Sequence, residues 1–431
     1  MSDSPGADAR LGRFAISAAF FIEGLSFAVL VTRVSVLQEK FGLSNGMLTL
    51  VLLVVPVIAG AGSVLAGPLA ARYGSRAVLR VAQPVVCLAV VATGFASTLP
   101  GLFAAVAVFG LAIGAGDATM NIQAAAAEER YGHSILTGFY SVWSAAGILG
   151  GVWNAAASKV GLSLGAAFAV AAAAGIAGSV ATAHWLFATG RAAREGTPPA
   201  APAAPTAPAA APSPAATAAS AAGTAPAPAG APVAIAWRPI ILIGIAMCAM
   251  YIGDAGISNF SSTYMAHAVG STKVLAPLAF SAYQAMMVLG RAVGDRCVRA
   301  FGAANVVRAG GLIAAVGLIG VVAAPSPYLA IAAFAVTGLG LCVVPPQSFS
   351  ATAKLDPTGS GIAISRVNVF NYAGFVLGAA LVGGIADAGG WRVAFAAPLV
   401  LTAVIVLLAR GFDPAPARAD GYPAAQPLIQ E

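Results

Sequence analysis

Three acidic residues lie inside long apolar stretches of this sequence. Glu23, Asp117 and Asp254 are surrounded mainly by alanine, glycine and other apolar residues. A carboxylate in such surroundings is costly, so it normally faces the interior of a helix bundle or a water-filled cavity. Burial disfavours its charged form, so the group can bind a proton on one side and release it on the other as its exposure changes. The three residues are candidates for proton coupling, although each could instead be paired with a polar group and never titrate.

Polar and aromatic side chains in the same stretches could line a solute site. Amides match hydroxyl groups and aromatic rings pack against the face of a sugar, but the same set could hold other small polar molecules or serve helix packing. Arg33 could pair with a buried carboxylate or hold an anionic solute, or extend to the membrane interface. The other candidates are Asn121, Gln123, Tyr140, Trp143, Asn259, Tyr283, Gln284, Gln347, Asn368 and Asn371.

The stretches that carry these residues are long enough to cross a membrane. The 431 residues are 59% hydrophobic and only 9% charged, whereas a soluble domain has about 25% charged residues. Apolar runs of about 20 residues, the length needed to cross a bilayer, recur from Leu11 to Leu408. The first run is longer than the core of a cleavable signal peptide and contains Glu23, so it is expected to be retained. We predict an all-α polytopic membrane protein.

Twelve transmembrane helices are predicted, in two pseudo-symmetric six-helix halves. Glu23 and Asp117 then lie near the bilayer centre, because the rise along a helix is about 1.5 Å per residue. The predicted helices are 12–38, 47–71, 77–98, 101–127, 135–158, 163–189, 238–266, 275–300, 304–324, 327–352, 359–387 and 391–410. The predicted units are a tail over 1–11, a half over 12–189, a linker over 190–236, a half over 237–410 and a tail over 411–431.

The linker and the basic residues define the expected topology. Residues 196–235 are almost wholly Ala, Pro, Thr, Ser and Gly, a composition too poor in large apolar residues to fold. With both termini in the cytoplasm, the outer loops hold only Lys40, Lys159, Lys273 and Arg392 among the basic residues. This distribution follows the positive-inside rule. We expect a disordered cytoplasmic linker and cytoplasmic termini.

The two halves are predicted to be parallel repeats. The stretch GPLAARYGSRAVLR at 67–80 resembles VGDRCVRAFGAANVVR at 293–308 in the second half. In the same way, GLAIGAG at 110–116 resembles GLGLCVV at 338–344. A third pair is AAGILGG at 145–151 and YAGFVLG at 372–378. Transporters built from such repeats bind their solute near the bilayer midplane, between the halves.

One loop carries a family resemblance. Residues 67–76, GPLAARYGSR, resemble the G-x-L-A-D-R-x-G-R-[KR] signature of the major facilitator superfamily, with alanine in place of the usual aspartate at position 71. In that superfamily the loop governs the change between inward-facing and outward-facing states. The resemblance implies the major facilitator fold and makes Gly67, Arg72, Gly74 and Arg76 candidates for a conformational loop.

Three helices resemble the fucose-permease-like subgroup of bacterial permeases. They contain Glu23-Gly24 with Arg33-Val34-Ser35, the pattern from Gly110 to Gln123 with Asp117 and Asn121, and Gly253-Asp254-Ala255-Gly256 with Asn259-Phe260. In the permeases that the chain resembles, carboxylates on the first and fourth helices are the proton and sugar sites. This resemblance implies those roles for Glu23 and Asp117. Asp254 corresponds to Glu23 when the repeats are aligned.

The expected function is secondary active transport, by proton-coupled symport of a sugar or related metabolite. A proton-coupled efflux antiporter is an alternative, although residues 146–151, AGILGG, lack the proline of the antiporter signature G-P-x-x-G-G. A transporter-like sensor is another. The sequence contains no metalloprotease, nucleophile-elbow or phosphate-loop motif that would indicate an enzyme. Cys87, Cys248, Cys297 and Cys342 lie singly, without the spacing of metal ligands, so no metal and no cofactor are expected.

The expected partners are a small-molecule substrate, protons and membrane lipid. The formal charge of +7 does not come from a basic cluster with interleaved aromatics, so no nucleic acid is expected. The abundance of alanine, glycine and arginine suggests a bacterial source, and therefore the bacterial inner membrane. We expect the chain to work as a monomer.

The linker is predicted to be dispensable, because it contributes no core and only connects two halves that pack through their helices. Deleting about 25 of its residues should leave expression and transport intact, since the rest still spans the connection. Membrane expression and solute uptake of the deletion variant measure this. Loss of the protein from the membrane would show that the segment is structural.

Overall fold

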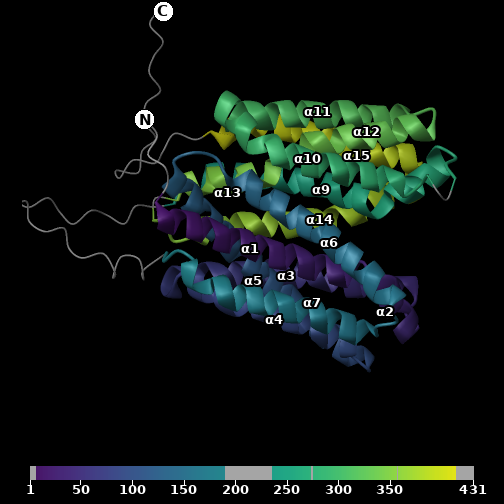
Figure 1. The fold of residues 1–431 in the computed structure, drawn as a ribbon. Coiled ribbons are helices and arrows are strands. Elements are labelled where there is room, and N and C mark those ends of the chain that lie inside the picture. Colours follow the sequence, from purple (N-terminus) through teal and green to yellow (C-terminus); the bar gives the residue numbers. More distant parts are fainter. Residues whose placement is uncertain (1–5, 190–234, 273–274, 357, 414–431) are drawn as a thin grey trace, which may run out of the picture.

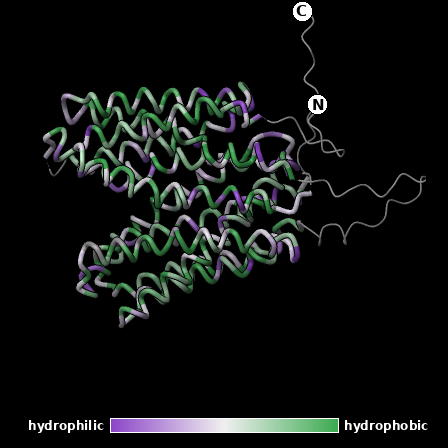
Figure 2. The backbone as a smooth tube through the Cα atoms, turned by 180° about the vertical axis from the view of Figure 1, so that it is seen from behind, coloured by the Kyte–Doolittle hydropathy of each residue, from purple (hydrophilic) through white to green (hydrophobic). Residues whose placement is uncertain are grey.

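The structure, a computed structural model, describes residues 6–189, 235–272, 275–356 and 358–413. Nearly all of the predicted linker, 190–236, and most of the tail 411–431 lie outside the described residues. Within these ranges the chain forms helices and short connections, with no strand. Figure 2 shows hydrophobic residues along most of each helix. The predicted all-α polytopic fold is confirmed.

The N-terminal half contains the first six crossings. Its helices are α1 (Ala7–Val31), α2 (Val34–Phe41), α3 (Asn45–Tyr73), α4 (Ser75–Phe95), α5 (Leu99–Tyr131), α6 (Leu136–Lys159) and α7 (Leu164–Thr182), followed by the turn η1 (Ala183–Trp185). Hydroxyl side chains cap several of them: the Oγ atoms of Ser44 and Ser163 accept hydrogen bonds from Met47 N and Ala166 N. Such caps satisfy backbone N–H groups that the first helical turn leaves free.

The C-terminal half contains the other six crossings. Its helices are α9 (Trp237–Ala268), α10 (Leu278–Phe301), α11 (Ala303–Ala323), α12 (Pro327–Leu341), α13 (Val344–Lys354), α14 (Ile362–Gly389) and α15 (Trp391–Leu408), followed by the turn η2 (Ala409–Phe412). Ten segments of the described chain are long and apolar enough to span a membrane. The crossings α6 and α10 are not among them, because both carry polar side chains that meet between the halves.

The predicted repeat is visible in the packing. In the N-terminal half α1 packs against α6, and α3 and α4 pack against α5. In the C-terminal half α9 packs against α14, and α10 and α11 pack against α12. Single glycines join the equivalent pairs α3–α4 and α10–α11: φ is 84° at Gly74 and 79° at Gly302. A side chain with a Cβ rarely adopts such angles, so both turns require glycine.

Two predicted helices are each broken in two. The predicted helix 12–38 ends at Val31 and resumes at Val34. The Asn154 Nδ2 atom donates to Val29 O at 2.8 Å and to Thr32 Oγ1 at 2.6 Å, which holds the break in place. The predicted helix 327–352 is interrupted between Leu341 and Val344. There Pro345 and Pro346 lack the N–H groups that a continuous helix would need.

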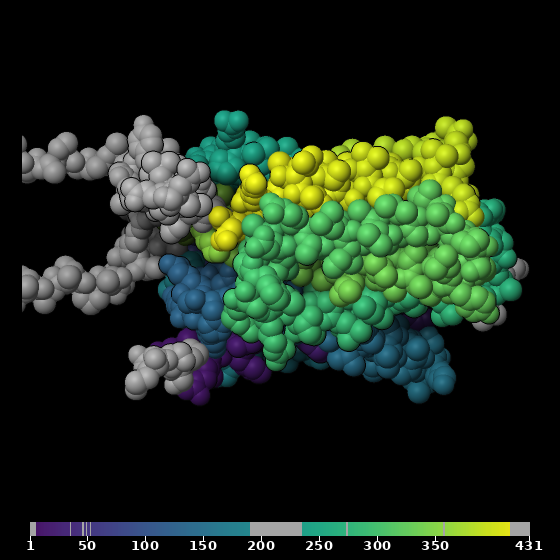
Figure 3. All heavy atoms as spheres, turned by 90° about the horizontal axis from the view of Figure 1, so that it is seen from above, coloured from purple at the N-terminus to yellow at the C-terminus, as the bar shows by residue number. Residues whose placement is uncertain are grey.

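The halves meet mainly at one end of the bundle, which we call the terminal side. It holds the start of α1 and the end of α15, and the helices diverge toward the opposite, far side (Figure 1). One buried apolar cluster includes residues of both halves. In it the rings of Tyr140 and Phe349 stack with centroids 6.4 Å apart. Seen from its own side, the C-terminal half covers much of the N-terminal half (Figure 3).

The contact between α3 and α5 gives a direct test of this packing. A Cβ at Gly114 would lie 1.9 Å from Ala59 O, so Gly114→Ala must separate the two helices. Overpacking of this kind costs about 1–3 kcal/mol. We expect a lower melting temperature in detergent, measured by fluorescence-detected size-exclusion chromatography after heating. The control is Gly147→Ala, where a Cβ would meet nothing within 4 Å, and an equal loss there would contradict the packing argument.

Candidate functional site

The carboxylate of Asp117 joins the two halves. Its Oδ1 accepts a hydrogen bond from Asn121 Nδ2 at 3.1 Å, within α5. Its Oδ2 accepts hydrogen bonds from Tyr372 Oη at 2.9 Å and from Asn371 Nδ2 at 3.4 Å, both on α14 of the other half. The side chain is only partly buried. One acidic group therefore receives donors from both halves and remains accessible.

Further hydrogen bonds extend this polar cluster. Tyr140 Oη on α6 donates to Asn121 Oδ1 at 3.1 Å. Asn371 Nδ2 is also 3.4 Å from Asn368 Oδ1. Asn371 Oδ1 is buried without a hydrogen-bond partner. The structure thus brings together four predicted amide and tyrosine residues around Asp117, and leaves one buried acceptor available.

Glu23 lies beside this cluster on α1. Only 4% of its surface is exposed, and its Oε2 atom is buried without a hydrogen-bond partner. That oxygen would be 3.0 Å from a Cβ at Gly116, so Glu23 lies directly against the α5 backbone next to Asp117. The two carboxyl groups are close enough to interact electrostatically. Their repulsion is relieved when one of them binds a proton.

Asp254 forms a second acidic position on the C-terminal half. Its Oδ1 accepts a hydrogen bond from Tyr283 Oη at 2.6 Å, which links α9 to α10. Asp254 is partly buried, whereas Tyr283 is fully buried. Tyr251, also on α9, interacts electrostatically with both Asp117 and Asp254. Tyr251 thus lies within electrostatic range of both acids, although Asp254 has its own hydrogen-bond partner.

Other predicted residues lie away from Asp117. Gln123 donates to Ser75 Oγ and Phe187 O and accepts from Phe187 N, so its amide holds the end of the N-terminal half together. Arg33 Nη2 donates to Asn154 O at 3.0 Å beside the α1–α2 break. Asn259 is exposed and donates to Ala255 O within its own helix.

The remaining three differ in their surroundings. Gln347 Nε2 donates to Thr137 Oγ1 at 3.3 Å, between the halves. Trp143 lies against Phe27, with ring centroids 5.8 Å apart. Gln284 is partly exposed on α10. Gln347 and Trp143 lie beside the space between the helices, but neither forms a hydrogen bond with Glu23, Asp117 or Asp254.

Tyr372 and Arg291 are two cluster members that sequence reasoning missed. Tyr372 begins the repeat stretch YAGFVLG and lies four positions after Asn368, on the same helix face. That spacing was the available signal. Arg291 is a single basic residue within a predicted helix; its Nη1 donates to Ser144 Oγ at 2.7 Å and its guanidinium lies 5.5 Å from the Tyr140 ring centroid.

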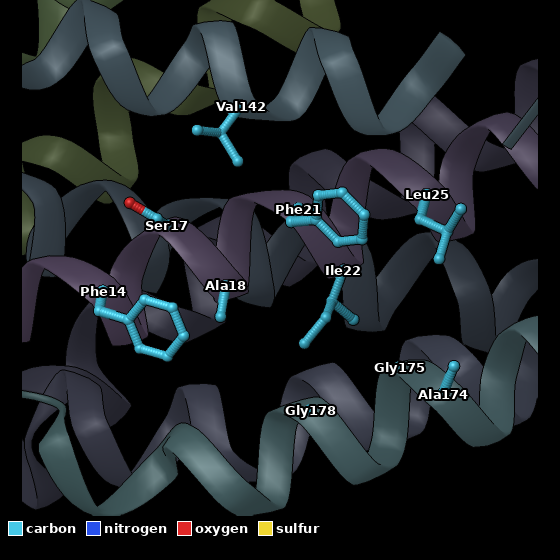
Figure 4. Close-up of a pocket in the computed structure, with 10 residues that line it drawn as sticks. All are labelled: Phe14, Ser17, Ala18, Phe21, Ile22, Leu25, Val142, Ala174, Gly175 and Gly178. Carbon is cyan, nitrogen blue, oxygen red and sulfur yellow. The ribbon is translucent and has the colours of Figure 1, made fainter. Parts of the chain in front are cut away.

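Two hollows lie on the flanks of the bundle. One of about 370 Å³ is lined by Phe14, Phe21, Ile22 and Leu25 of α1, with Val142 of α6 on one side of α1 and Gly175 and Gly178 of α7 on the other (Figure 4). Another of about 430 Å³ lies along α3, α4 and α5. Neither is lined by a candidate site residue. Among the described residues, no group of three or more His, Cys, Asp or Glu could hold a metal ion.

Comparisons with known proteins agree with this geometry. The family model described as Major Facilitator Superfamily matches residues 242–430. An uncharacterized MFS-type transporter of Yersinia pestis is 27% identical over 396 residues, which covers 91% of this chain and 93% of that protein. The crystal structure of FucP, a major facilitator superfamily transporter, in its outward conformation has a TM-score of 0.71 at 14% identity, covering 94% of this chain and 99% of that chain.

The matching family model and the first curated relative are those of major facilitator superfamily transporters, and the chain has the fold of such a transporter. The proton:xylose symporter XylE has the same fold, with a TM-score of 0.66 at 12% identity, covering 94% of this chain and 95% of that chain. The matching family model and fold are thus those of transporters and not of enzymes, as predicted.

The loop that resembles the superfamily's signature lies at the terminal side of α3. A Cβ at Gly67 would be 2.2 Å from Ser365 Oγ, so glycine lets α3 approach α14. Arg72 is exposed, and its guanidinium lies 5.1 Å from the Tyr73 ring centroid. The Nε atom of Arg76 is buried without a hydrogen-bond partner. The contact of α3 with α14 includes Ser63 Oγ donating to Ser365 O at 2.8 Å, and no carboxylate occupies position 71.

The equivalent contact between α10 and α6 does contain a carboxylate. Asp295 of α10 accepts hydrogen bonds from Ser134 Oγ at 2.9 Å, Thr137 N at 3.0 Å and Gly138 N at 2.7 Å. These groups surround the N-terminus of α6, where backbone N–H groups and the helix dipole favour an anion. We call this contact the inter-half cap. It fastens the terminal side on the α6–α10 flank, whereas the α3–α14 flank lacks such a carboxylate.

A second carboxylate caps α6 from its own half. Glu128 Oε2 accepts hydrogen bonds from Ile135 N and Leu136 N, both at 3.1 Å. Its Oε1 accepts a short hydrogen bond from Ser350 Oγ of α13, in the other half. Asp356 plays the corresponding part before α14, where its Oδ2 accepts from Gly361 N at 3.2 Å. Asp356 caps only within the C-terminal half, so it offers a matched control for Asp295.

We predict that Asp295→Asn loosens the terminal side. Hydrogen bonds to a charged group contribute about 1.5–3 kcal/mol, so weakening the inter-half cap should shift the balance of closed and open states about tenfold or more. Spin labels on cysteines at His133 and Phe301, which are exposed on opposite halves, should show a longer and broader distance distribution by pulsed EPR in a background without the native cysteines. Asp356→Asn should leave that distribution unchanged. An identical response of both variants would argue against the cap.

Proposed function

We propose that this chain is a proton-coupled symporter for a small polar solute, a sugar or a related metabolite, working by alternating access. The observation that carries the proposal is the position of Asp117, whose carboxylate accepts hydrogen bonds from α14 while it belongs to α5. A change of its charge alters the attraction between the halves directly. Proton binding and the movement of the halves are therefore coupled at one group.

Glu23 supplies the second proton-binding position. Its unpartnered Oε2 beside Asp117 gives the pair a site at which one proton can be held and passed on. When both groups are ionised, their repulsion favours proton uptake. When Asp117 is protonated, its hydrogen bonds from Tyr372 and Asn371 lose their charged acceptor and weaken. We propose that solute binding replaces these lost interactions and allows the halves to rock.

The polar groups around the acids support a hydroxylated solute. Asn121, Asn368 and Asn371 present amides, and Tyr140 and Tyr372 present rings with hydroxyl groups. Such sets bind sugars and related metabolites through paired donors and acceptors. Among the transporters of the same fold, FucP of E. coli is named a fucose:proton symporter and XylE a proton:xylose symporter.

The orientation follows from the charge distribution. We place the terminal side in the cytoplasm, because the basic residues concentrate there. The closed terminal side then corresponds to an outward-facing state, the direction in which a symporter loads its solute and proton. We further propose a monomer in a bacterial inner membrane, with both termini cytoplasmic, since the two halves that form the site come from one chain.

The test concerns Asp117→Asn in proteoliposomes. The amide keeps the volume and most hydrogen bonds but cannot carry the proton, so accumulation driven by external acidification should fall to the background level. Exchange of labelled solute at equal pH should survive, because it needs no net proton movement. Glu23→Gln should behave in the same way. The matched control is Asp387→Asn, an exposed acid on α14, which should accumulate solute like the unchanged protein.

Three results would count against the proposal. If Asp117→Asn vesicles still concentrate solute against its gradient when the outside is acidified, Asp117 is a structural residue. If the unchanged protein expels solute in exchange for protons, the chain is an efflux antiporter. A chain that binds solute but moves none, and whose Glu23 and Asp117 variants signal normally, would be a sensor.

A further inference from the structure

Arg291 is a buried cation that the proton-coupling scheme does not use. It lies on α10 with 7% of its surface exposed. Its Nη1 donates to Ser144 Oγ of the opposite half, and its guanidinium lies over the Tyr140 ring. Its Nε atom is buried without a hydrogen-bond partner. No carboxylate among the described residues forms an ion pair with it.

A buried guanidinium without a paired anion is unusual. The arginine side chain carries a permanent positive charge. Burying an unpaired charge is costly, so such groups are normally paired or bind a ligand. A hydroxyl group and one aromatic face compensate only part of this cost. The side chain thus has hydrogen-bonding capacity that the protein leaves unused.

Among the three candidate acids, Asp254 is the one that interacts electrostatically with Arg291. The two groups attract each other electrostatically, but the Asp254 carboxylate accepts its hydrogen bond from Tyr283 instead. The other titratable groups that interact with Arg291 are Tyr140, Tyr251, Tyr283 and Cys342. The tyrosine hydroxyls are neutral donors and do not compete with an anion. Because Tyr140 and Tyr283 already donate their hydroxyl protons to Asn121 and Asp254, an anionic ligand would meet the guanidinium as its charged donor.

The position of Arg291 connects it to the solute site. Its ring partner Tyr140 donates to Asn121, and Asn121 donates to Asp117. Arg291 belongs to the C-terminal half and contacts the N-terminal half, whereas Asp117 belongs to the N-terminal half and contacts the C-terminal half. A ligand bound between them would touch both halves, which a solute in alternating access requires.

We propose that Arg291 binds the carboxylate of the transported solute, and that the solute is a hydroxylated monocarboxylate such as a sugar acid. This inference rests on the proposed function and specifies its substrate class. The planar guanidinium offers parallel N–H donors that match a carboxylate. The amides and tyrosine around Asp117 take the hydroxyl groups. A phosphate dianion fits less well, because Glu23, Asp117 and Asp254 all lie nearby.

The experiment compares acids with their neutral counterparts on the purified full-length protein. The probes are D-glucuronate and D-galacturonate against D-glucose and D-galactose, and D-gluconate against D-glucitol. We expect at least one carboxylate, and not its neutral counterpart, to raise the melting temperature with saturable binding. Arg291→Gln should weaken that binding at least tenfold, and Arg291→Lys should weaken it less. The control is Arg366→Gln, a partly buried arginine on α14, which should bind as the unchanged protein does.

Three outcomes would overturn the inference. They are equal binding of the neutral counterparts, unchanged carboxylate binding by Arg291→Gln, and binding of no carboxylate in the panel. A structural pairing of Arg291 with Asp254 is tested separately by a double-mutant cycle on melting temperature. If Asp254→Asn and Arg291→Gln cost the same and the double variant costs no more than either, Arg291 serves Asp254 and not the solute.

Vesicle uptake separates this inference from the proposed function. If a neutral sugar accumulates under an inward proton gradient, symport stands and the carboxylate inference fails. If a sugar acid binds the unchanged protein and not Arg291→Gln, yet does not accumulate under that gradient, the inference stands and proton symport fails.

Discussion

A polar group at membrane depth has to find its partners within the protein, because hydrocarbon supplies no hydrogen bonds. Asp117 meets this requirement with donors from α5 and from α14 of the opposite half. The arrangement of the two halves and the charge of one carboxylate are therefore linked. Tyr140 and Asn121 extend this network to α6, and Arg291 of α10 adjoins it through its contact with the Tyr140 ring.

The two flanks of that interior are fastened differently. On the α6–α10 flank the inter-half cap uses a carboxylate and backbone N–H groups, whereas the α3–α14 flank relies on Ser63, Ser365 and close approach at Gly67. The repeat is thus symmetrical in its helices and asymmetrical in its polar contacts. Opening the terminal side breaks charged hydrogen bonds on one flank and only a neutral one on the other. The two flanks need not separate together.

Helix positions could be predicted from the sequence because apolar runs and glycine turns are local features. The breaks were harder: the one near Thr32 depends on Asn154 from another helix, although Pro345 and Pro346 signalled the second. Helical spacing could have shown that Asn121 and Gln123 face different sides of α5, because residues two apart on a helix point about 200° from each other. Asn121 lies one turn from Asp117, and Gln123 faces Phe187 instead. The partners of Arg291 depend on how the halves meet, which no local pattern encodes.

The cap on α6 also links this protein to the water around it. While the terminal side is closed, Thr137 N and Gly138 N donate to Asp295. Once the halves part, these N–H groups and the freed carboxylate have to be hydrated, because unpaired polar groups are costly. Opening therefore takes up water molecules, and its equilibrium depends on water activity. An excluded osmolyte favours the closed terminal side, so osmotic stress and solute binding act on the same conformational balance.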